Sequence, residues 1–260
     1  MIINVFKVYI VSASNSFAEV CALLLFSVKM IFSRNKNGRL LISEITKNQI
    51  YFTGVQSFLI ISVISFLLGA VVTIESVTQL SKWNATELIG KILVLVILRE
   101  LGPIFTSLIV IGRSATAMAT EIGNMAVSKE IEALKSMGID PVRYIVAPRL
   151  TGMVVSMVML TVYFNVVGIT GGLLAAKMML SIPYLILYKK FIWAVTYSDI
   201  LVAFLKSFGF GIIIAIIAVY HGLNVKISST EVPQAATNAV VNSLLVLFIY
   251  NSLLTILFYL

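Results

Sequence analysis

Three charged side chains lie inside stretches of sequence that are otherwise apolar. Arg99 and Glu100 interrupt the apolar segment 92–111, and Lys206 lies within the apolar segment 200–220. A charged group inside a membrane span is costly, so it normally pairs with another group or faces a protein interior or a wet cavity. We therefore expect these side chains either to form structural ion pairs or to line a path for a substrate with a charged headgroup.

Arg99 and Glu100 are neighbours in the sequence. Adjacent positions on a helix do not face the same side, so we predict that the two side chains have different partners, with a subunit interface as one place to find them. Gly102 and Pro103 follow directly. Because proline removes a backbone hydrogen bond, this pair should kink or break the span.

The longest hydrophilic stretch after the N-terminal region is 113–149. Ser128 is predicted to cap a short helix whose first turn holds Glu130 and Glu132, because negative charge is favourable near the positive end of the helix dipole. Gly138 should end this helix.

The predicted helix, 128–137, carries Ile131 and Leu134 on one face. Asp140-Pro141 should start another helix after it. The pattern therefore predicts a short helix that lies across the membrane surface between the second and third spans. Two interpretations follow: an ordinary interfacial connector, or a lever through which a partner moves the two spans.

The chain offers little material for catalysis or metal binding. Its one cysteine, Cys21, excludes an intramolecular disulfide and a cysteine-based zinc site, and its one histidine, His221, leaves little for a histidine-rich metal centre. No GxxxxGK(S/T), HExxH or GxSxG motif is present. The small-residue run 112–119 therefore predicts close helix packing rather than a phosphate loop. We expect no catalytic residue, no metal and no cofactor, so the chain should not be an enzyme.

The composition is that of a membrane protein. Hydrophobic residues make up 60% of the chain and charged residues 12%, whereas about a quarter of a soluble domain is charged. The runs 48–74, 151–176 and 232–260 contain no charged residue, and each exceeds the roughly 20 residues needed to cross a bilayer. The net charge is +8. In a membrane protein, basic residues mark the cytoplasmic ends of spans, so we do not interpret this charge as a sign of nucleic-acid binding.

The predicted fold is an all-α integral membrane protein with a short coupling helix between the second and third spans. The five transmembrane helices are expected at about 51–74, 92–111, 150–176, 200–220 and 235–260. Residues 1–50 should form amphipathic helices that lie in the interface. The alternative for this region is an extra span over 5–32, which would have to bury Glu19.

The distribution of basic residues predicts the orientation. The N-terminal segment, the central region and the last loop together carry 12 Lys and Arg residues, and the loops of the opposite face carry 5. By the positive-inside rule, the N-terminus and the central region are cytoplasmic and the C-terminus is outside. In the third span, Gly168, Gly171 and Gly172 should let another backbone approach closely.

An ordered set of short motifs resembles one known family. The motifs are Leu98-Arg99-Glu100-Leu101-Gly102-Pro103, Gly112-Arg113, Thr120-Glu121-Ile122-Gly123-Asn124-Met125, Glu132-Ala133-Leu134, Asp140-Pro141 and Pro148-Arg149. Together they resemble the MlaE/YrbE-type permease family, the membrane subunits of MCE-associated ABC lipid transporters. The resemblance covers about residues 40–260.

This resemblance implies a homodimer of five-span subunits, in which 51–260 is the permease domain. It also implies two cytoplasmic ABC ATPase subunits on the loop between the second and third spans, a hexameric MCE-domain lipid-binding protein on the outer face, and membrane phospholipid held between the two permease copies. The expected location is the bacterial inner membrane, with the plastid inner envelope as the alternative.

The resemblance further implies residue roles. Arg99, Glu100 and Lys206 match polar groups near the family's lipid path. Asn251 stands where the family can carry an acidic residue, a departure that leaves its role open. The cytoplasmic lever maps to 121–137, and the residues expected to couple it to the ATPase are Glu121, Lys129, Glu130, Ile131, Leu134 and Met137.

Two other classes of function are the alternatives. A secondary transporter or channel for a small amphipathic or anionic solute commonly shows repeated halves, and five spans divide poorly into halves. An intramembrane enzyme would need a nucleophile, and none stands out beside Glu100. The sequence leaves the identity of the lipid and the direction of its movement open.

Overall fold

The computed structural model describes residues 39–83, 88–180, 184–226 and 228–259, which are helical and contain no strand. The predicted interfacial helices before residue 39 and the alternative span over 5–32 lie outside the described residues. The predicted all-α fold is confirmed for the part of the chain that is described.

Five helical columns are long and apolar enough to cross a membrane: Ile42–Lys82, Ile89–Val127, Val142–Met179, Tyr197–Leu223 and Glu231–Phe258. The predicted number of spans is confirmed. Each column begins before its predicted start and the first four also end after their predicted end, because a helix can extend past the hydrocarbon through polar residues that hydropathy assigns to loops.

The first column contains α2 (Arg39–Thr53), the short 3₁₀ turn η1 (Val55–Ser57) and α3 (Phe58–Lys82). Helix α2 covers both sides of the predicted domain boundary at residue 50. It packs against the start of the third column, where a Cβ added to Gly152 would lie 2.7 Å from the Gln49 Cβ.

The second column is continuous past Gly102-Pro103, where a kink or break was predicted, and past residue 111, where the span was predicted to end. It is built from α4 (Ile89–Leu93), the π-helix η3 (Val94–Leu101), α5 (Gly102–Val110), the π-helix η4 (Ile111–Ala115) and α6 (Thr116–Val127). Of the kink or break expected at Gly102-Pro103, the break is wrong: the π-helical stretch η3 ends at Leu101 and the helix continues through Gly102 and Pro103 as α5. The hydrophilic stretch that begins at residue 113 is also helical up to Val127, because its small residues let α6 pack between other helices.

The short helix α7 (Glu130–Ser136) follows α6, and its predicted N-cap is wrong. Ser128 ends α6, while Lys129 adopts a left-handed conformation at φ 58° and begins α7 with no side-chain cap. The predicted end at Gly138 is confirmed: Gly138 has φ 75°, its N–H donates to the Lys135 carbonyl at 3.0 Å, and the Ile139 N–H donates to the Leu134 carbonyl at 2.9 Å. These two bonds form a Schellman motif, which satisfies carbonyls at the helix end.

The remaining elements complete the third, fourth and fifth columns. The Asp140 carboxylate accepts a hydrogen bond from the Val142 N–H at 2.9 Å and so begins the next helical segment, as predicted. This segment contains the π-helix η5 (Val142–Val146) and α8 (Ala147–Leu180), and it is followed by α9 (Tyr184–Ala194), α10 (Tyr197–Leu223) and α11 (Glu231–Tyr259).

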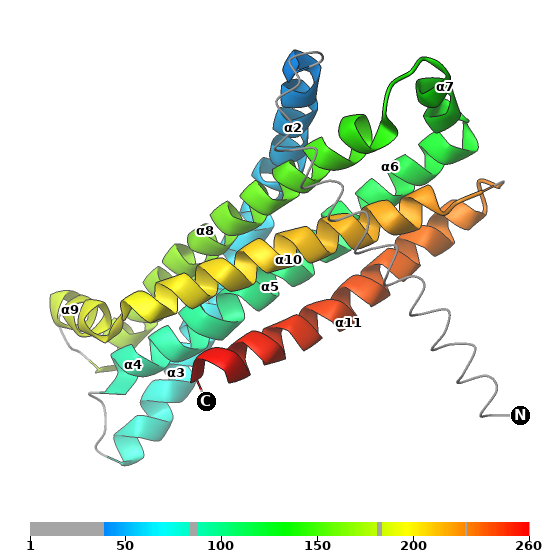
Figure 1. The fold of residues 1–260 in the computed structure, drawn as a ribbon. Coiled ribbons are helices and arrows are strands. Elements are labelled where there is room, and N and C mark those ends of the chain that lie inside the picture. The colour runs from blue at the N-terminus through cyan, green and yellow to red at the C-terminus, as the bar shows by residue number, and fades with distance from the viewer. Residues whose placement is uncertain (1–38, 84–87, 181–183, 227, 260) are drawn as a thin grey trace, which may run out of the picture.

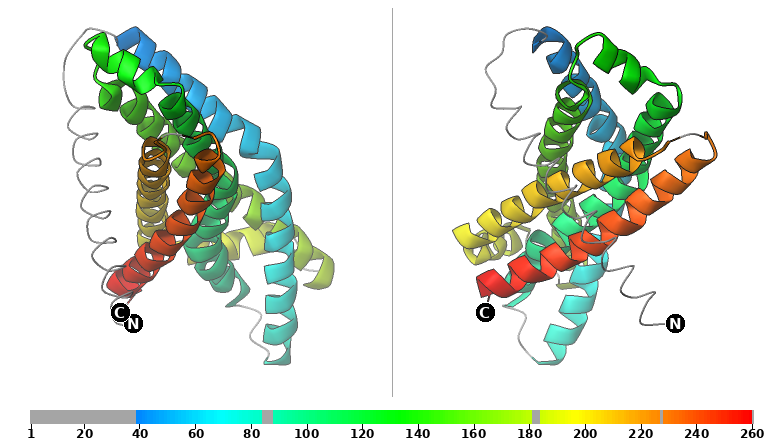
Figure 2. Two further views of the ribbon diagram at one scale, coloured as in Figure 1. Left: turned by 90° about the vertical axis from the view of Figure 1, so that its right-hand side faces the viewer. Right: turned by 45° about the vertical axis from the view of Figure 1, so that its right-hand side comes forward.

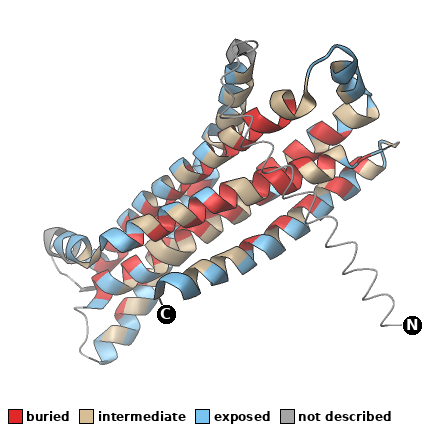
Figure 3. Cartoon of the chain, in the orientation of Figure 1, coloured by how far each residue is buried: buried red, intermediate tan, exposed pale blue. Residues whose placement is uncertain are grey.

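Helices α3 and α8 approach closely at small residues, as predicted for Gly168 and its neighbours. A Cβ added to Gly69 of α3 would overlap the Gly168 backbone, and one added to Gly171 would lie 2.6 Å from the Phe66 carbonyl oxygen. Helix α10 lies in the interior of the bundle and α11 on its outside (Figure 3). In their most apolar 18-residue windows, 61% of α10 but only 11% of α11 is buried.

The bundle has two ends that carry different elements. Helices α2 and α7 lie at one end, and α9 lies at the other, together with the C-terminal end of α11 (Figures 1 and 2). We call these the α7 end and the α9 end. Each end carries one group of polar residues.

Candidate functional site

The first polar group lies toward the α9 end, where Arg99 of η3 meets the start of α10. The Arg99 guanidinium forms an ion pair with Asp199, in which Nε donates to Oδ1 at 2.5 Å. The other Asp199 oxygen accepts the Thr196 N–H at 2.9 Å and completes a capping box at the start of α10. Asp199 is fully buried, so one carboxylate both caps this helix and neutralises Arg99.

Lys206 lies behind this pair and is fully buried. Its Nζ donates to Glu100 Oε1 at 2.7 Å, to Thr255 Oγ1 at 2.9 Å and to the Arg99 carbonyl at 3.3 Å. That carbonyl is available because Pro103, four residues later, has no N–H to donate to it. An ammonium group has three donors, and all three have acceptors here.

The Glu100 carboxylate joins the fifth column to this group. Its Oε1 also accepts the Thr255 hydroxyl at 3.2 Å, and its Oε2 accepts the Asn251 amide at 3.2 Å. Lys206, Glu100, Asn251 and Thr255 therefore tie together the second, fourth and fifth columns. With Arg99 and Asp199 they form what we call the charge cluster.

The charge cluster contains two cations and two anions, and it presents only two of them at the surface. The side chains of Glu100 and Arg99 are 30% and 20% exposed, whereas those of Asp199 and Lys206 are 1% and 0% exposed. Both exposed residues lie in the π-helical stretch η3, and π-helical turns are frequent at functional sites. The cluster thus offers a guanidinium and a carboxylate side by side, held from behind by buried partners.

The prediction that Arg99 and Glu100 have different partners is confirmed, and both partners lie within the same chain. Asp199 was not predicted as a site residue, although Thr196 three residues earlier is the signal of a capping box. Thr255 was not predicted either, although it lies one helical turn after Asn251 and therefore on the same face of α11.

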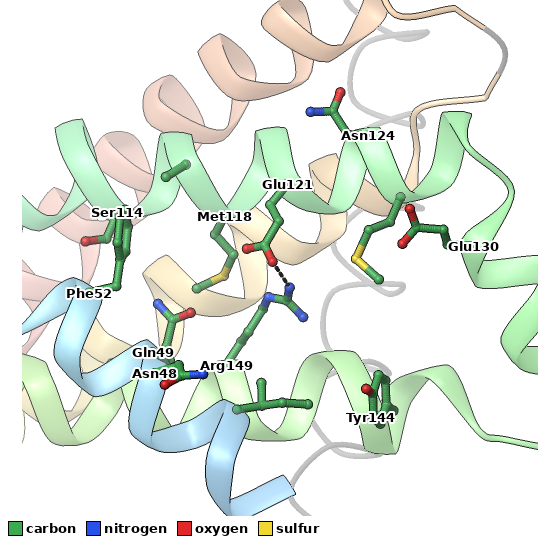
Figure 4. Close-up of a pocket in the computed structure, with 13 residues that line it drawn as sticks. Asn48, Gln49, Phe52, Ser114, Met118, Glu121, Asn124, Glu130, Tyr144 and Arg149 are labelled. Atoms are coloured by element: carbon green, nitrogen blue, oxygen red, sulfur yellow. Dashed lines mark hydrogen bonds and ion pairs between the residues drawn. The ribbon is translucent and has the colours of Figure 1, made fainter. Parts of the chain in front are cut away.

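The second polar group lies at the α7 end and lines a cleft of about 770 Å³. Its walls come from α2, the segment from η4 into α6, the N-terminal residue of α7 and the segment from η5 into α8 (Figure 4). The lining residues are Ile45, Asn48, Gln49, Phe52, Ser114, Ala117, Met118, Glu121, Asn124, Met125, Glu130, Tyr144 and Arg149. We call it the α7 cleft.

An ion pair crosses the α7 cleft between α6 and α8. Arg149 donates to Glu121 Oε1 at 2.7 Å (Figure 4). It also donates to the Ile145 carbonyl at 3.2 Å. The Arg149 side chain is 7% exposed and that of Glu121 is 61% exposed. Arg149 is thus part of the wall, while the Glu121 carboxylate reaches into the open cleft.

The six expected coupling residues occupy three different environments. Glu121 and Glu130 line the α7 cleft. Ile131 and Leu134 pack against the main hydrophobic core, so they hold α7 in place. Lys129 and Met137 are exposed, Met137 at 66%.

Arg113 supports the inner end of the α7 cleft. It donates to Ser57 Oγ at 3.1 Å and to the Gln56 side chain, and its guanidinium lies 5.2 Å from the centre of the Phe52 ring. These contacts connect η4 to the turn between α2 and α3, so the first and second columns are fixed to each other beside the cleft.

Comparisons with known proteins agree with this architecture. The family described as Permease MlaE matches residues 46–257. The chain is 34% identical over 214 residues to a probable ABC transporter permease protein of Rickettsia prowazekii, which covers 81% of this chain and 82% of that protein. It is 33% identical over 208 residues to the intermembrane phospholipid transport system permease protein MlaE of Haemophilus influenzae, which covers 80% of each.

A plant relative extends the comparison beyond bacteria. The chain is 31% identical over 214 residues to the chloroplastic protein TRIGALACTOSYLDIACYLGLYCEROL 1 of Arabidopsis thaliana, which covers 82% of this chain and 61% of that protein. The family match spans all five helical columns of the structure. This multi-pass membrane protein therefore belongs to the MlaE permease family.

Proposed function

We propose that this chain is the permease subunit of an ABC transporter that moves phospholipid, or a similar lipid, between the membrane and an MCE-domain partner. ATP hydrolysis takes place on a separate ATPase subunit. The observation that carries the proposal is the charge cluster, because it presents a partly exposed guanidinium and carboxylate, Arg99 and Glu100, within an apolar bundle, and charged groups inside a membrane span mark substrate paths. The name of the Haemophilus influenzae relative supports phospholipid as the cargo.

In this proposal, Arg99 and Glu100 meet the lipid headgroup, and Lys206 positions them. Arg99 and Glu100 are the charged members of the cluster with exposed side chains. Lys206 is buried and all its donors have acceptors within the chain. A headgroup phosphate is a favourable partner for a guanidinium, whose geometry matches phosphate oxygens.

A homodimer would enclose the lipid path. Helix α11 exposes apolar side chains along its length, among them Leu245, Ile249, Leu253 and Leu257. In the bilayer such a face contacts either lipid tails or a second copy of the chain, and dimers with a two-fold axis are the commonest assemblies. The proposed location is the bacterial inner membrane with a cytoplasmic N-terminus; the chloroplastic relative keeps the plastid inner envelope as the alternative.

The ATPase would dock at the α7 end. Ile131 and Leu134 anchor α7 on the core, so a force on α7 reaches α6 and α8 directly. The Glu121–Arg149 ion pair connects the same two helices. Closure of an ATPase on α7 would therefore move the second and third columns together.

Purification of the chain in mild detergent, followed by identification of bound proteins and lipids, tests the proposal. We expect an ABC ATPase, an MCE-domain protein and phospholipid. In proteoliposomes that contain the assembled complex, Arg99→Ala should reduce ATP-dependent phospholipid transfer at least tenfold, while Lys82→Ala, at an exposed helix end, should leave it unchanged. ATP hydrolysis by the purified chain alone, or gradient-driven uptake without an ATPase, would overturn the proposal.

A further inference from the structure

The last turn of the π-helix η3, which carries the two exposed charges of the charge cluster, is short of backbone hydrogen bonds. The Gly102 N–H closes this turn by donating to the Ile97 carbonyl, in the i to i−5 pattern of a π-helix. Pro103 follows and has no N–H, and the Arg99 carbonyl accepts the Lys206 ammonium instead. The place of this turn therefore depends on side chains that reach it from other helices.

Helix α8 contacts this turn at both of its ends. A Cβ added to Gly168 would lie 3.3 Å from Ile97 Cγ2, at the start of the turn. Asn165 is three residues before Gly168 and so lies on the same face of α8. It fills the space beside Gly102, at the end of the turn: a Cβ added to Gly102 would overlap the Asn165 Oδ1 and lie 2.9 Å from its Cγ. The carboxamide can occupy this place only because residue 102 is glycine.

The Asn165 side chain contributes shape and position at this contact and little bonding energy. Asn165 is 7% exposed, and its Oδ1 is buried with no hydrogen-bond partner among the described residues. One Cα–H bond of Gly102 points at this oxygen, since an added Cβ would overlap it, and such Cα–H···O contacts are weak. Burial of an unpaired amide lowers stability rather than raising it.

A pair of aromatic rings fixes α8 against α5 directly beside Asn165. The Phe164 ring stacks on the Phe105 ring with their centroids 6.5 Å apart, and Phe164 is 1% exposed. Asn165 is therefore held in a packed interior, where its rotamer has little freedom. Side chains locked in this way can hold a functional group within about 0.5 Å of its working position.

We infer that Asn165 is a positioning residue of the headgroup site. Its carboxamide, packed against Gly102, sets the place of the last turn of η3 and thereby the place of Arg99 and Glu100. This inference rests on the proposed function, since it requires that these two charges meet a lipid headgroup. Lys206 of α10 supports the same turn through the Arg99 carbonyl, so α8 and α10 hold the turn together.

Substitutions at this contact test the inference in proteoliposomes that contain the assembled complex. Asn165→Ala should lower ATP-dependent phospholipid transfer about threefold or more, because the turn loses its support. Its thermal midpoint should stay near that of wild type, because the lost packing is offset by removal of an unpaired buried amide. Gly102→Ala pushes a methyl group into the carboxamide and should lower transfer as well. Gly112→Ala, in the same column with open space around it, is the matched control and should change neither quantity.

Two double variants show whether Asn165 acts through Gly102 and through the charges of η3. In Gly102→Ala/Asn165→Ala the new methyl group enters the space that the carboxamide leaves, so transfer should exceed that of Gly102→Ala. In an Arg99→Ala background, Asn165→Ala should lower transfer by a clearly smaller factor than in wild type, because the group that it positions is already gone. A residue that only stabilises the fold would lower transfer by the same factor in both backgrounds.

The possible outcomes are distinguishable. Wild-type transfer by Asn165→Ala would overturn the positioning role and leave the proposed function standing, as would equal factors in the two backgrounds. A thermal midpoint that falls in parallel with transfer would assign Asn165 a structural role instead. Failure of the wild-type complex to transfer phospholipid with ATP would overturn the proposed function, and the inference with it.

Discussion

Replacing Glu100 by glutamine removes the only carboxylate that contacts the Lys206 ammonium among the described residues. The glutamine keeps the size of the side chain, and its carbonyl oxygen can still accept hydrogen bonds from Thr255 and Lys206 in place of Oε1. Its NH2 group takes the place of Oε2 and cannot accept from Asn251. Lys206, fully buried, therefore keeps hydrogen-bond acceptors but has no charged partner among the described residues. The variant therefore isolates the charge of the partner from its shape.

The expected loss of stability follows from the burial of Lys206. Removing one partner of a buried ion pair typically costs 3–5 kcal/mol, and because Glu100 is 30% exposed, we expect the lower value, about 3 kcal/mol. Lys206→Met leaves Glu100 with Asn251 and Thr255 as donors and should cost less, about 1.5 kcal/mol. The double variant Glu100→Gln/Lys206→Met has no unpaired charge and should lie within about 1 kcal/mol of wild type.

The free energy of unfolding of each variant would be measured by titrating SDS into mixed micelles. Lys82→Met, which makes the same substitution at an exposed helix end, is the control and should match wild type. A loss below about 1 kcal/mol for Glu100→Gln would contradict the burial argument, since an unpaired buried charge costs more than that. A double variant as unstable as the sum of the two single variants would show that the two residues are not coupled.

Three further predictions concern packing, a helix end and the second ion pair. Gly69→Leu should unfold the chain or lower its thermal midpoint strongly, because the Cβ overlaps the Gly168 backbone, whereas Gly112→Ala, with open space around it, should not. Gly138→Ala should destabilise the end of α7 by about 1 kcal/mol, because its φ of 75° is unfavourable for alanine; faster hydrogen exchange at Ile139 would report it, and unchanged exchange would refute it. Asp199→Asn removes the carboxylate that pairs with Arg99, so it should lower phospholipid transfer several-fold and the free energy of unfolding by about 1 kcal/mol or more. The conservative Asp199→Glu should recover part of the transfer, and a full effect on stability with none on transfer would assign the residue a structural role alone.

Several features of the fold could be predicted from local sequence. The three uncharged runs, with the apolar segments 92–111 and 200–220, predicted five spans because the length of a membrane helix is set by the bilayer and not by other parts of the chain. The end of α7 at Gly138 was predictable for a similar reason, since a left-handed residue after a helix is nearly always glycine. The different partners of Arg99 and Glu100 followed from helical geometry alone.

Other local patterns were misleading because a neighbouring element decided the structure. Residues 113–127 are polar enough to resemble a loop, yet they form the end of a helix that packs against α10, where a Cβ on Gly222 would lie 2.8 Å from the Ile122 Cβ. Ser128 had the side chain of a cap, but the chain bends at Lys129 instead. Hydropathy and capping preferences do not report what a helix packs against.

The composition and order of the residues thus determined that this chain lies in a bilayer and how often the chain crosses the bilayer. They also identified three charged residues within spans, Arg99, Glu100 and Lys206, that need partners. Only the tertiary structure decided how they are explained, because Asp199 and Arg99 are 100 residues apart and Thr255 is 155 residues from Glu100. Such pairs meet through the packing of whole helices, which local sequence does not encode. The α7 cleft has the same origin, since its walls come from four segments that meet only in the folded bundle.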